Sequence, residues 1–243
     1  MLSRVANNLI WLERYMERGN GIISLLKVNF LANQDSPELF PWKPIIKTYT
    51  PEDNTFYTED SIECIDFMVL NADNPNSILN IVTKARENAR SVQEHISREL
   101  WLCINNYYLF LTKKGIHKKL NEEEPIEFLD SLKVFHLMFY GTMDITQERG
   151  ASYYFMNIGK FLERVIQITD FTAIKLTEIA KTSDSLEQSF YWKNLLLSVG
   201  GYQLYLKKHK SSFREDHIIT MVFQDKLFPR SIYYCINKLG RHV

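Results

Sequence analysis

Chain-breaking residues are scarce in this sequence. Its 243 residues include only 9 glycines and 7 prolines, fewer than the average shares of about 7% and 5% would give. Because so few residues interrupt regular structure, long uninterrupted elements can form, and long elements are usually helices. Strand-like alternation is convincing nowhere in the chain. The sequence therefore predicts an all-α fold, a bundle of long helices with additional short helices.

Excess charge and long apolar runs are also absent. The 29 basic residues balance 29 acidic ones, whereas general binding of nucleic acid or of a membrane surface depends on excess positive charge. No stretch approaches the ~18 apolar residues of a membrane span, and Met1–Arg4 lead into an amphipathic pattern rather than a secretory signal. The three cysteines at 64, 103 and 235 are odd in number and widely spaced, which is typical of reduced thiols. We expect a cytoplasmic protein without nucleic-acid or membrane partners.

Familiar catalytic and cofactor motifs are missing as well. The sequence contains no P-loop, no dinucleotide-binding fingerprint and no nucleophile elbow. None of its six histidines has a glutamate three residues before it, so the Glu-x-x-His pattern of di-iron bundles is absent. The cysteines lack metal-ligand spacing. We therefore expect no cofactor and no metal, and the sequence indicates no catalytic residue.

Apolar residues recur at helical spacing along most of the chain. From Leu2 to Phe30 they step by three and four residues, which predicts a first helix from Ser3 to about Asn33. Further long helices are predicted over about 75–111, 143–180 and 186–209, the last with a weak point at Gly200-Gly201. Shorter helices are predicted over about 59–70, 122–140, 213–224 and 229–239.

Two of the long helices carry a similar short segment. Leu12–Arg18 aligns with Ile158–Arg164, and both segments end in an apolar residue followed by Glu-Arg. A seven-residue match is too short to establish a repeat. It does suggest that the two helices are equivalent members of one bundle.

Several charges fall inside or at the edges of apolar helix faces. At about 100° per residue, Arg18 lies between Leu25 and Trp11, and Arg86 lies within the apolar face of the second long helix. The charges placed in this way are Arg4, Glu17, Arg18, Arg86, Arg90, Glu99, Glu148 and Arg164. Because an unpaired charge in such a position is costly, we expect these side chains to pair in a network shared by three or four helices.

Two roles for this network stay open. It either fixes only the register of the helices, or it lines a cleft that recognises a carboxylate or phosphate, to which the bidentate geometry of arginine is suited. A cleft that exposes Arg86, Arg90 and Glu99 together would favour an enzyme. A dry network beside an exposed apolar helix face would favour a structural adaptor.

Short blocks spread over nearly the whole chain resemble the alpha-E domain family of bacterial proteins, and they occur in the family's order. They are Met1–Ala6, Trp11–Arg18, Ala85–Arg90, Ser97–Trp101 with Asn105, Gly159–Arg164 and Phe228–Ser231. The resemblance implies an all-helical fold in the bacterial cytoplasm, often alongside a circularly permuted ATP-grasp protein and a transglutaminase-like protease. It adds Glu163 and Arg230 to the candidate site residues.

The sequence departs from the family in two places. The family tends to have an arginine six residues after each Glu-Arg pair, where this chain has Ser24 and Asp170. Members usually continue with more helix beyond the Pro-Arg-Ser segment, whereas this sequence ends at Val243. We expect residues 1–243 to form a single alpha-E-like helical domain, and it stays open whether C-terminal helices are missing or the chain is naturally short.

Three functions fit these observations. The resemblance implies an accessory protein of an ATP-grasp peptide or amino-acid ligation system, which binds the ligase or its peptide substrate. The alternatives are an enzyme whose Arg/Glu cleft acts on a carboxylate-bearing substrate, and a purely structural helical adaptor. A partner, or a second copy in a homo-oligomer, is expected to bind the apolar C-terminal segment. Its large side chains are Phe213, Met221, Phe223, Leu227, Phe228, Tyr233 and Tyr234.

Overall fold

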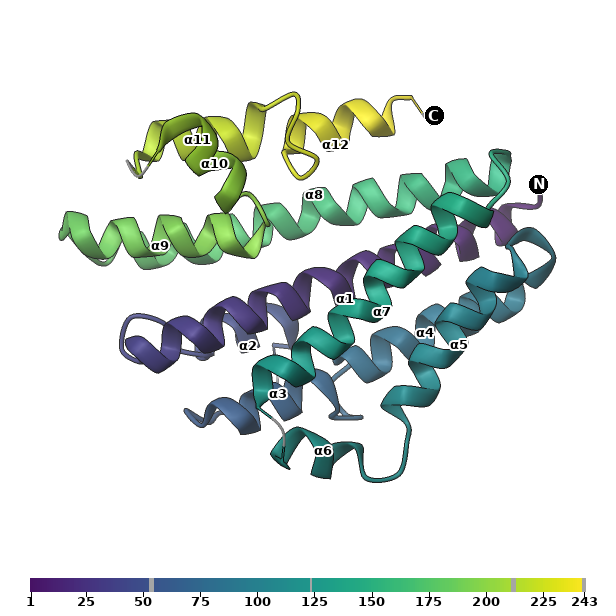
Figure 1. Ribbon diagram of the computed structural model, residues 1–243, viewed down its shortest axis with the longest axis horizontal. Helices are drawn as coiled ribbons and strands as arrows, with labels where there is room; N and C mark the ends of the chain where they lie inside the picture. Colours follow the sequence, from purple (N-terminus) through teal and green to yellow (C-terminus); the bar gives the residue numbers. More distant parts are fainter. Residues whose placement is uncertain (53–54, 123, 211–212, 242–243) are drawn as a thin grey trace.

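Twelve α-helices and one short 3-10 helix make up the described part of the computed structural model (Figure 1), which covers residues 1–52, 55–122, 124–210 and 213–241, the side chains of 121 and 122 excepted. No strand occurs among these residues, so the all-α prediction is confirmed. The structure does not test whether further helices follow Val243, because such helices would lie outside the described residues. The helices are α1 Ser3–Asp35, α2 Lys43–Tyr49, α3 Ser61–Val69, α4 Ile78–Ser91, η1 Gln93–His95, α5 Arg98–Leu111, α6 Ile116–Glu122, α7 Pro125–Thr146, α8 Ala151–Ile179, α9 Ser185–Ser198, α10 Tyr202–His209, α11 Glu215–Gln224 and α12 Ile232–Leu239.

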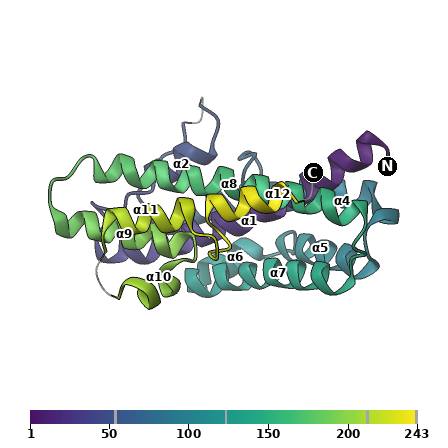
Figure 2. The same ribbon diagram turned by 90° about the horizontal axis from the view of Figure 1, so that it is seen from above.

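The long first helix organises the bundle. α1 contacts α3, α4, α7, α8 and α9, and its apolar residues Leu9, Leu12 and Met16 are at most 1% exposed. Figure 1 shows α8, α9 and the C-terminal helices on one side of α1 and α3 to α6 on the other, with α7 crossing in front. Figure 2 shows α8 lying along α1, with α9 turning back beside α8. α1 and α8 run in the same direction, because successive α8 residues meet successively later α1 residues.

The contact between α1 and α8 is close enough to need a glycine. A Cβ atom at Gly159 would lie 2.2 Å from the carbonyl oxygen of Ile10, far inside van der Waals contact. Glycine therefore lets the two helix backbones touch at this point. The segment in which the sequence repeats itself, Leu12–Arg18 and Ile158–Arg164, lies at this contact.

The predicted helix over 75–111 is wrong, because the structure divides it into α4 and α5. Between them the chain turns at Val92–Ser97, where Val92 and Ile96 are buried in the core. The Ser97 hydroxyl then accepts a hydrogen bond from the Leu100 N–H at 3.2 Å and starts α5 as its N-cap. Gln147 fixes the same turn by accepting from the Ser97 N–H at 3.0 Å and donating to the His95 carbonyl at 3.1 Å.

The boundary between α7 and α8 also differs from the prediction. α7 continues through Gly141 to Thr146, and the break falls at Gln147–Gly150 instead. Glu148 therefore lies exposed in a turn and not on an apolar helix face. At Gly200-Gly201 the predicted weak point is a complete break, since α9 ends at Ser198 and Gly200 has a φ of +68°, which glycine adopts readily.

None of the described helices combines the length and the apolar character that crossing a bilayer requires.

Candidate functional site

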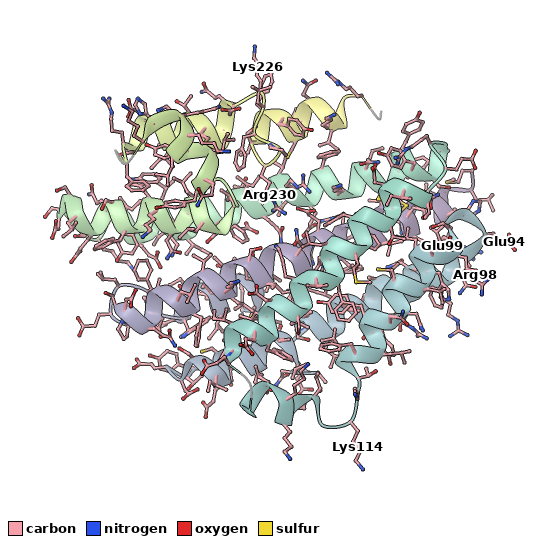
Figure 3. All side chains as sticks on the ribbon, viewed as in Figure 1. Glu94, Arg98, Glu99, Lys114, Lys226 and Arg230 are labelled. Carbon is pink, nitrogen blue, oxygen red and sulfur yellow. The ribbon has the colours of Figure 1, made fainter. Side chains whose placement is uncertain are left out.

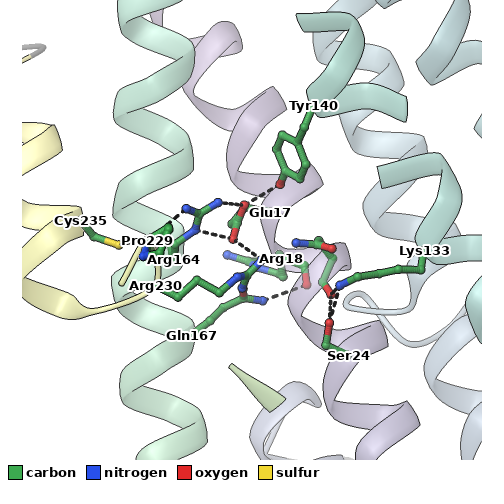
Figure 4. Close-up of polar contacts among 11 residues, drawn as sticks. Glu17, Arg18, Ser24, Lys133, Tyr140, Arg164, Gln167, Pro229, Arg230 and Cys235 are labelled. Atoms are coloured by element: carbon green, nitrogen blue, oxygen red, sulfur yellow. Dashed lines mark hydrogen bonds and ion pairs between the residues drawn. The ribbon is translucent and has the colours of Figure 1, made fainter. Parts of the chain in front are cut away.

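Two Glu-Arg pairs face each other across the contact between α1 and α8, and Figure 4 shows the contacts of Glu17 and Arg164. Glu17 of α1 accepts two hydrogen bonds from Arg164 of α8, from Nε at 2.8 Å and from Nη2 at 2.9 Å. Glu163 of α8 accepts from Arg18 Nε at 2.6 Å and from Arg14 Nε at 2.8 Å, both on α1. Each helix thus supplies the glutamate for the other helix's arginine, because the same motif lies at the same height on two parallel helices.

Glu17 is the most enclosed member of this cluster. It is fully buried, and besides Arg164 it accepts a hydrogen bond from the Tyr140 hydroxyl at 2.5 Å and lies 3.3 Å from Arg230 Nη2. Burial alone would raise the pKa of its carboxyl group, but the charges of Arg164 and Arg230 and the hydrogen bonds hold that pKa well below its ordinary value. Glu17 is therefore a carboxylate with its lone pairs occupied.

The turn before α12 delivers Arg230 to this cluster. The Asp225 carboxylate accepts from the N–H groups of Leu227 and Phe228 at 2.7 and 2.9 Å, and the Ser231 hydroxyl both donates to the Asp225 carbonyl and accepts from the Tyr234 N–H as the N-cap of α12. The Pro229 carbonyl accepts from Arg164 Nη1 at 3.2 Å. The Phe-Pro-Arg-Ser segment is thereby connected to the α1–α8 contact.

Five predicted network members lie elsewhere. Arg4, Arg90, Glu99 and Glu148 are exposed, and Figure 3 shows Glu99 at the outer edge of the molecule, away from the central Arg230. The half-buried Arg86 donates to Asn105 Oδ1 at 2.8 Å and lies 4.6 Å from the Tyr108 ring centroid. The prediction that these residues join one buried network was wrong. For Glu99 and Glu148 the reason is that the chain turns at 92–97 and 147–150, where we predicted continuous helices.

Glu17, Arg18, Glu163, Arg164 and Arg230 are the predicted residues that the structure brings together. Sequence reasoning missed three polar residues of α7 that face α1. Tyr140 contacts Glu17, His136 lies next to Gly19, and Lys133 contacts Ser24. These three follow one another at spacings of three and four, and therefore share one face of α7. That spacing was the available signal.

The helical fold and the Glu-Arg pairs agree with the description of one family model. A family model described as a predicted α-helical domain with a conserved ER motif matches residues 1–243. The chain belongs to the Alpha-E family. This Alpha-E chain carries Glu-Arg at 13–14, 17–18, 148–149 and 163–164, and only the pairs on α1 and α8 enter the buried cluster. Among curated proteins and among solved structures, no match to the chain was found.

Candidate metal ligands and thiols are not gathered in the described part of this Alpha-E chain. Across those residues, no three or more His, Cys, Asp or Glu side chains lie close enough to share a metal ion. The three cysteines are buried and unpaired, and burial raises the pKa of the Cys64 and Cys235 thiols to about 12 and about 11. The expectation of a protein without metal or cofactor stays a prediction.

Glu13, one turn before Glu17, is buried without a hydrogen-bond partner among the described residues for either carboxyl oxygen. Burial raises the pKa of its carboxyl group to about 8, although the nearby Lys160 charge acts in the opposite direction. The folded protein therefore holds a proton on Glu13 at neutral pH, whereas the unfolded chain, with the ordinary value of 4.5, has released it. The free energy of unfolding therefore falls as the pH rises above 4.5, because folding then requires Glu13 to take up a proton.

Glu13→Gln should consequently stabilise the protein increasingly as the pH rises from about 5 to about 8, the window between the two pKa values. Urea unfolding of parent and variant across this range measures the difference in free energy of unfolding. Glu99→Gln, at an exposed position of α5, is the control for replacing a glutamate by glutamine at the surface. A constant difference for Glu13→Gln would show that Glu13 is ionised and solvated in the folded state.

Proposed function

We propose that this Alpha-E chain is a non-catalytic accessory protein of an ATP-grasp peptide or amino-acid ligation system. In this role it binds the ligase or its peptide substrate in the bacterial cytoplasm. The observation that carries the proposal is the burial of the charge cluster. Glu17 and Glu163 are at most 1% exposed, and two arginines surround each of them. Carboxylates held in this way are unsuited to exchange protons with a substrate, and are suited to fixing helices.

An exposed apolar stripe on α7 supports a binding role. Val134, Leu137, Met138 and Ile145 are between 50% and 84% exposed, and with Gly141 their spacing places them on one face of the helix. Contiguous apolar surface of this kind marks interaction sites, and a helix face is a common docking element. The predicted C-terminal surface is smaller, because Met221 and Phe228 are buried.

The remaining C-terminal groups divide by exposure. Phe213, Phe223 and Tyr234 are half-buried, whereas Leu227 is 79% and Tyr233 42% exposed. We therefore place the partner on the α7 stripe. A purely structural adaptor would also have a dry network and an apolar face, and it differs from an accessory protein in leaving the ligase's turnover of ATP unchanged.

Co-expression with the ATP-grasp-type protein of the same organism, followed by size-exclusion chromatography with light scattering, tests the proposal. The expected result is a complex that forms with the parent chain and with Ile236→Lys on α12, but is at least about tenfold weaker with Met138→Lys on α7. The two variants are matched, since the side chains are 55% and 50% exposed. Light scattering of the chain alone reveals self-association through the same surface.

Three other outcomes would contradict the proposal. Absence of a complex with the parent chain would overturn the accessory role. A complex weakened only by Ile236→Lys would move the partner to the C-terminal surface. A complex that forms without any change in ATP turnover or product formation would favour the structural adaptor.

A further inference from the structure

A cavity of about 700 Å³ lies beside the Glu-Arg cluster, between α1, the N-terminal half of α7, α9 and the turn before α10. Leu31, Phe190 and Leu197 line it and are 38% to 47% exposed, whereas Ile23 and Asn194 also line it and are at most 4% exposed. The cavity therefore opens to solvent at the first three residues and ends on the last two. Its size is that of a small-molecule or peptide-end site.

Lys133 lines the cavity, is half-buried, and has no acidic partner in contact. Its ammonium group is hydrogen-bonded to the Ser24 hydroxyl at 2.5 Å and to the Asn20 carbonyl at 3.3 Å (Figure 4), both of them neutral acceptors. No carboxylate among the described residues lies within 4.0 Å of it. Burial and the charge of Arg230 lower the pKa of Lys133 to about 8, so it is still mainly protonated at neutral pH. A half-buried cation without a counter-charge in contact favours an incoming anion.

Arg230 adds positive charge at the same place. It lines the cavity, and its guanidinium Nη2 lies 3.3 Å from Glu17 Oε1. Glu17, however, already forms the bidentate pair with Arg164. Arg164 and Arg230 therefore share the Glu17 carboxylate, and Lys133 has no carboxylate in contact. Among the residues that line the cavity, Lys27, Lys133, Lys193 and Arg230 are cationic, whereas Asp35 and Asp130 are acidic. The cavity therefore has a surplus of cationic groups that another carboxylate would balance.

Asn194 of α9 supplies a second, independent sign of a ligand. Its side chain lines the cavity and is 4% exposed, and its amide oxygen accepts no hydrogen bond from the described residues. A buried acceptor of this kind normally has a donor. The oxygen is closed to water in the observed orientation. A rotation of the amide group that turns the oxygen toward the cavity would let a bound molecule with an N–H group provide the donor.

The rest of the cavity wall is partly apolar. Ile23, Val28, Leu31 and Leu197 line it together with Lys27 and Asp130, which pair with each other, and with the charged residues Asp35 and Lys193. A ligand that fits has a carboxylate, an N–H group close to it and an apolar side chain. An N-acylated amino acid, the chemistry of a peptide's C-terminus, combines these three features.

We propose that this cavity binds the C-terminal end of a peptide, with the carboxylate between Lys133 and Arg230, an amide N–H donating to Asn194 and apolar side chains against Ile23 and Leu197. The residues of the cavity are the evidence that a peptide end binds. That this peptide is a substrate of the ligation system rests on the proposed function. A binding measurement with the isolated chain therefore separates the failure of one from the failure of the other.

Isothermal titration of the full chain at pH 7 with N-acetyl-leucyl-leucine and with its C-terminal amide tests the proposal. The two probes differ only in the charged group. The acid should bind at least about tenfold more tightly than the amide, because the amide lacks the carboxylate and so loses hydrogen bonds between charged groups. Inorganic phosphate should bind more weakly than the acid, since it reaches neither Asn194 nor the apolar wall.

Variants assign the recognition to residues. Lys133→Met keeps the length of the side chain and removes its charge, and should remove most of the preference for acid over amide. Asn194→Leu should weaken both probes by a similar factor. Lys207→Met, an equal charge change at an exposed position outside the cavity, should leave both affinities unchanged. Circular dichroism and thermal melting of each variant confirm that it is folded.

Three results would overturn the proposal. Neither probe binding at millimolar concentration would show that the cavity takes no peptide end. Equal affinity for acid and amide would remove the carboxylate from recognition. Phosphate binding as tightly as the acid, with no effect of Asn194→Leu, would reduce the site to a general anion site.

Discussion

Replacing Glu17 by glutamine is expected to lower the free energy of unfolding by about 3–5 kcal/mol, because one partner of a buried ion pair is removed. Arg164, which forms the bidentate pair with Glu17, is only 9% exposed, so water cannot replace its counter-charge. Glutamine keeps the shape of the side chain but offers only one acceptor atom to donors that now meet a neutral group. Urea unfolding at pH 7, followed by circular dichroism, measures the loss.

Two further variants calibrate this result. Glu163→Gln should cost less than Glu17→Gln, since its partners Arg14 and Arg18 are 17% and 20% exposed and can be hydrated. Glu99→Gln, at an exposed position, should change stability by no more than about 0.5 kcal/mol. If Glu17→Gln behaved like Glu99→Gln, the cluster would contribute nothing to stability.

The pH dependence of the Glu17 contribution has a definite sign. The folded-state pKa of Glu17 is depressed, so its stabilising contribution is present above the ordinary value of 4.5 and is lost progressively as the pH falls below it. Acid should therefore destabilise the parent protein more steeply than Glu17→Gln.

Gly159→Ala is the second substitution for which we expect a large loss, about 3 kcal/mol or more. The added Cβ would lie 2.2 Å from the Ile10 carbonyl oxygen and 2.9 Å from its carbon, which are backbone atoms that no rotamer change can move. The gain in helix propensity from Gly to Ala, about 1 kcal/mol, is too small to offset the separation of α1 from α8. A fall in melting temperature measures the effect.

Gly141→Ala is the matched control, and its expected sign is opposite. Gly141 also lies within a long helix, α7, but no atom lies within 4 Å of the Cβ that alanine would add. The substitution should stabilise the protein by about 0.5–1 kcal/mol through helix propensity and a less flexible unfolded chain. Equal effects of the two alanines would show that the helices tolerate a wider spacing at Gly159.

Much of the fold was accessible from local spacing. The apolar run from Leu2 to Phe30 predicted α1 to within two residues of its observed end at Asp35. The match between Leu12–Arg18 and Ile158–Arg164 suggested two equivalent members of one bundle, and the structure shows in addition that these two helices pack against each other. Helix periodicity survives in such elements because one continuous face is buried. Glu17 and Arg164 could be found for the same reason.

The misplaced residues depended on contacts between distant segments. Gln147 bonds to the backbone at His95 and Ser97, fifty residues away, and this contact fixes the turn that replaces a continuous helix. Glu99 and Glu148, on either side of these turns, were consequently assigned to the wrong surroundings. Lys133 was not predicted as a site residue, because a lysine on an amphipathic helix normally extends to solvent. Only the tertiary packing makes it half-buried.

The repetition of Glu-Arg on α1 makes the alignment of α8 ambiguous as far as charge is concerned. Glu13-Arg14 precedes Glu17-Arg18 by four residues, about 6 Å along the helix axis. Sliding α8 back by this distance would offer Glu13 to Arg164 and Arg14 to Glu163, and so keep a glutamate for Arg164 and one of the two arginines that Glu163 now has. It would also bring Glu163 to the level of Ile10, where the backbones leave no room even for a Cβ atom. The close contact at Gly159 therefore selects one of two similar alignments, and the unpaired Glu13 lies where the other alignment would place the partner of Arg164.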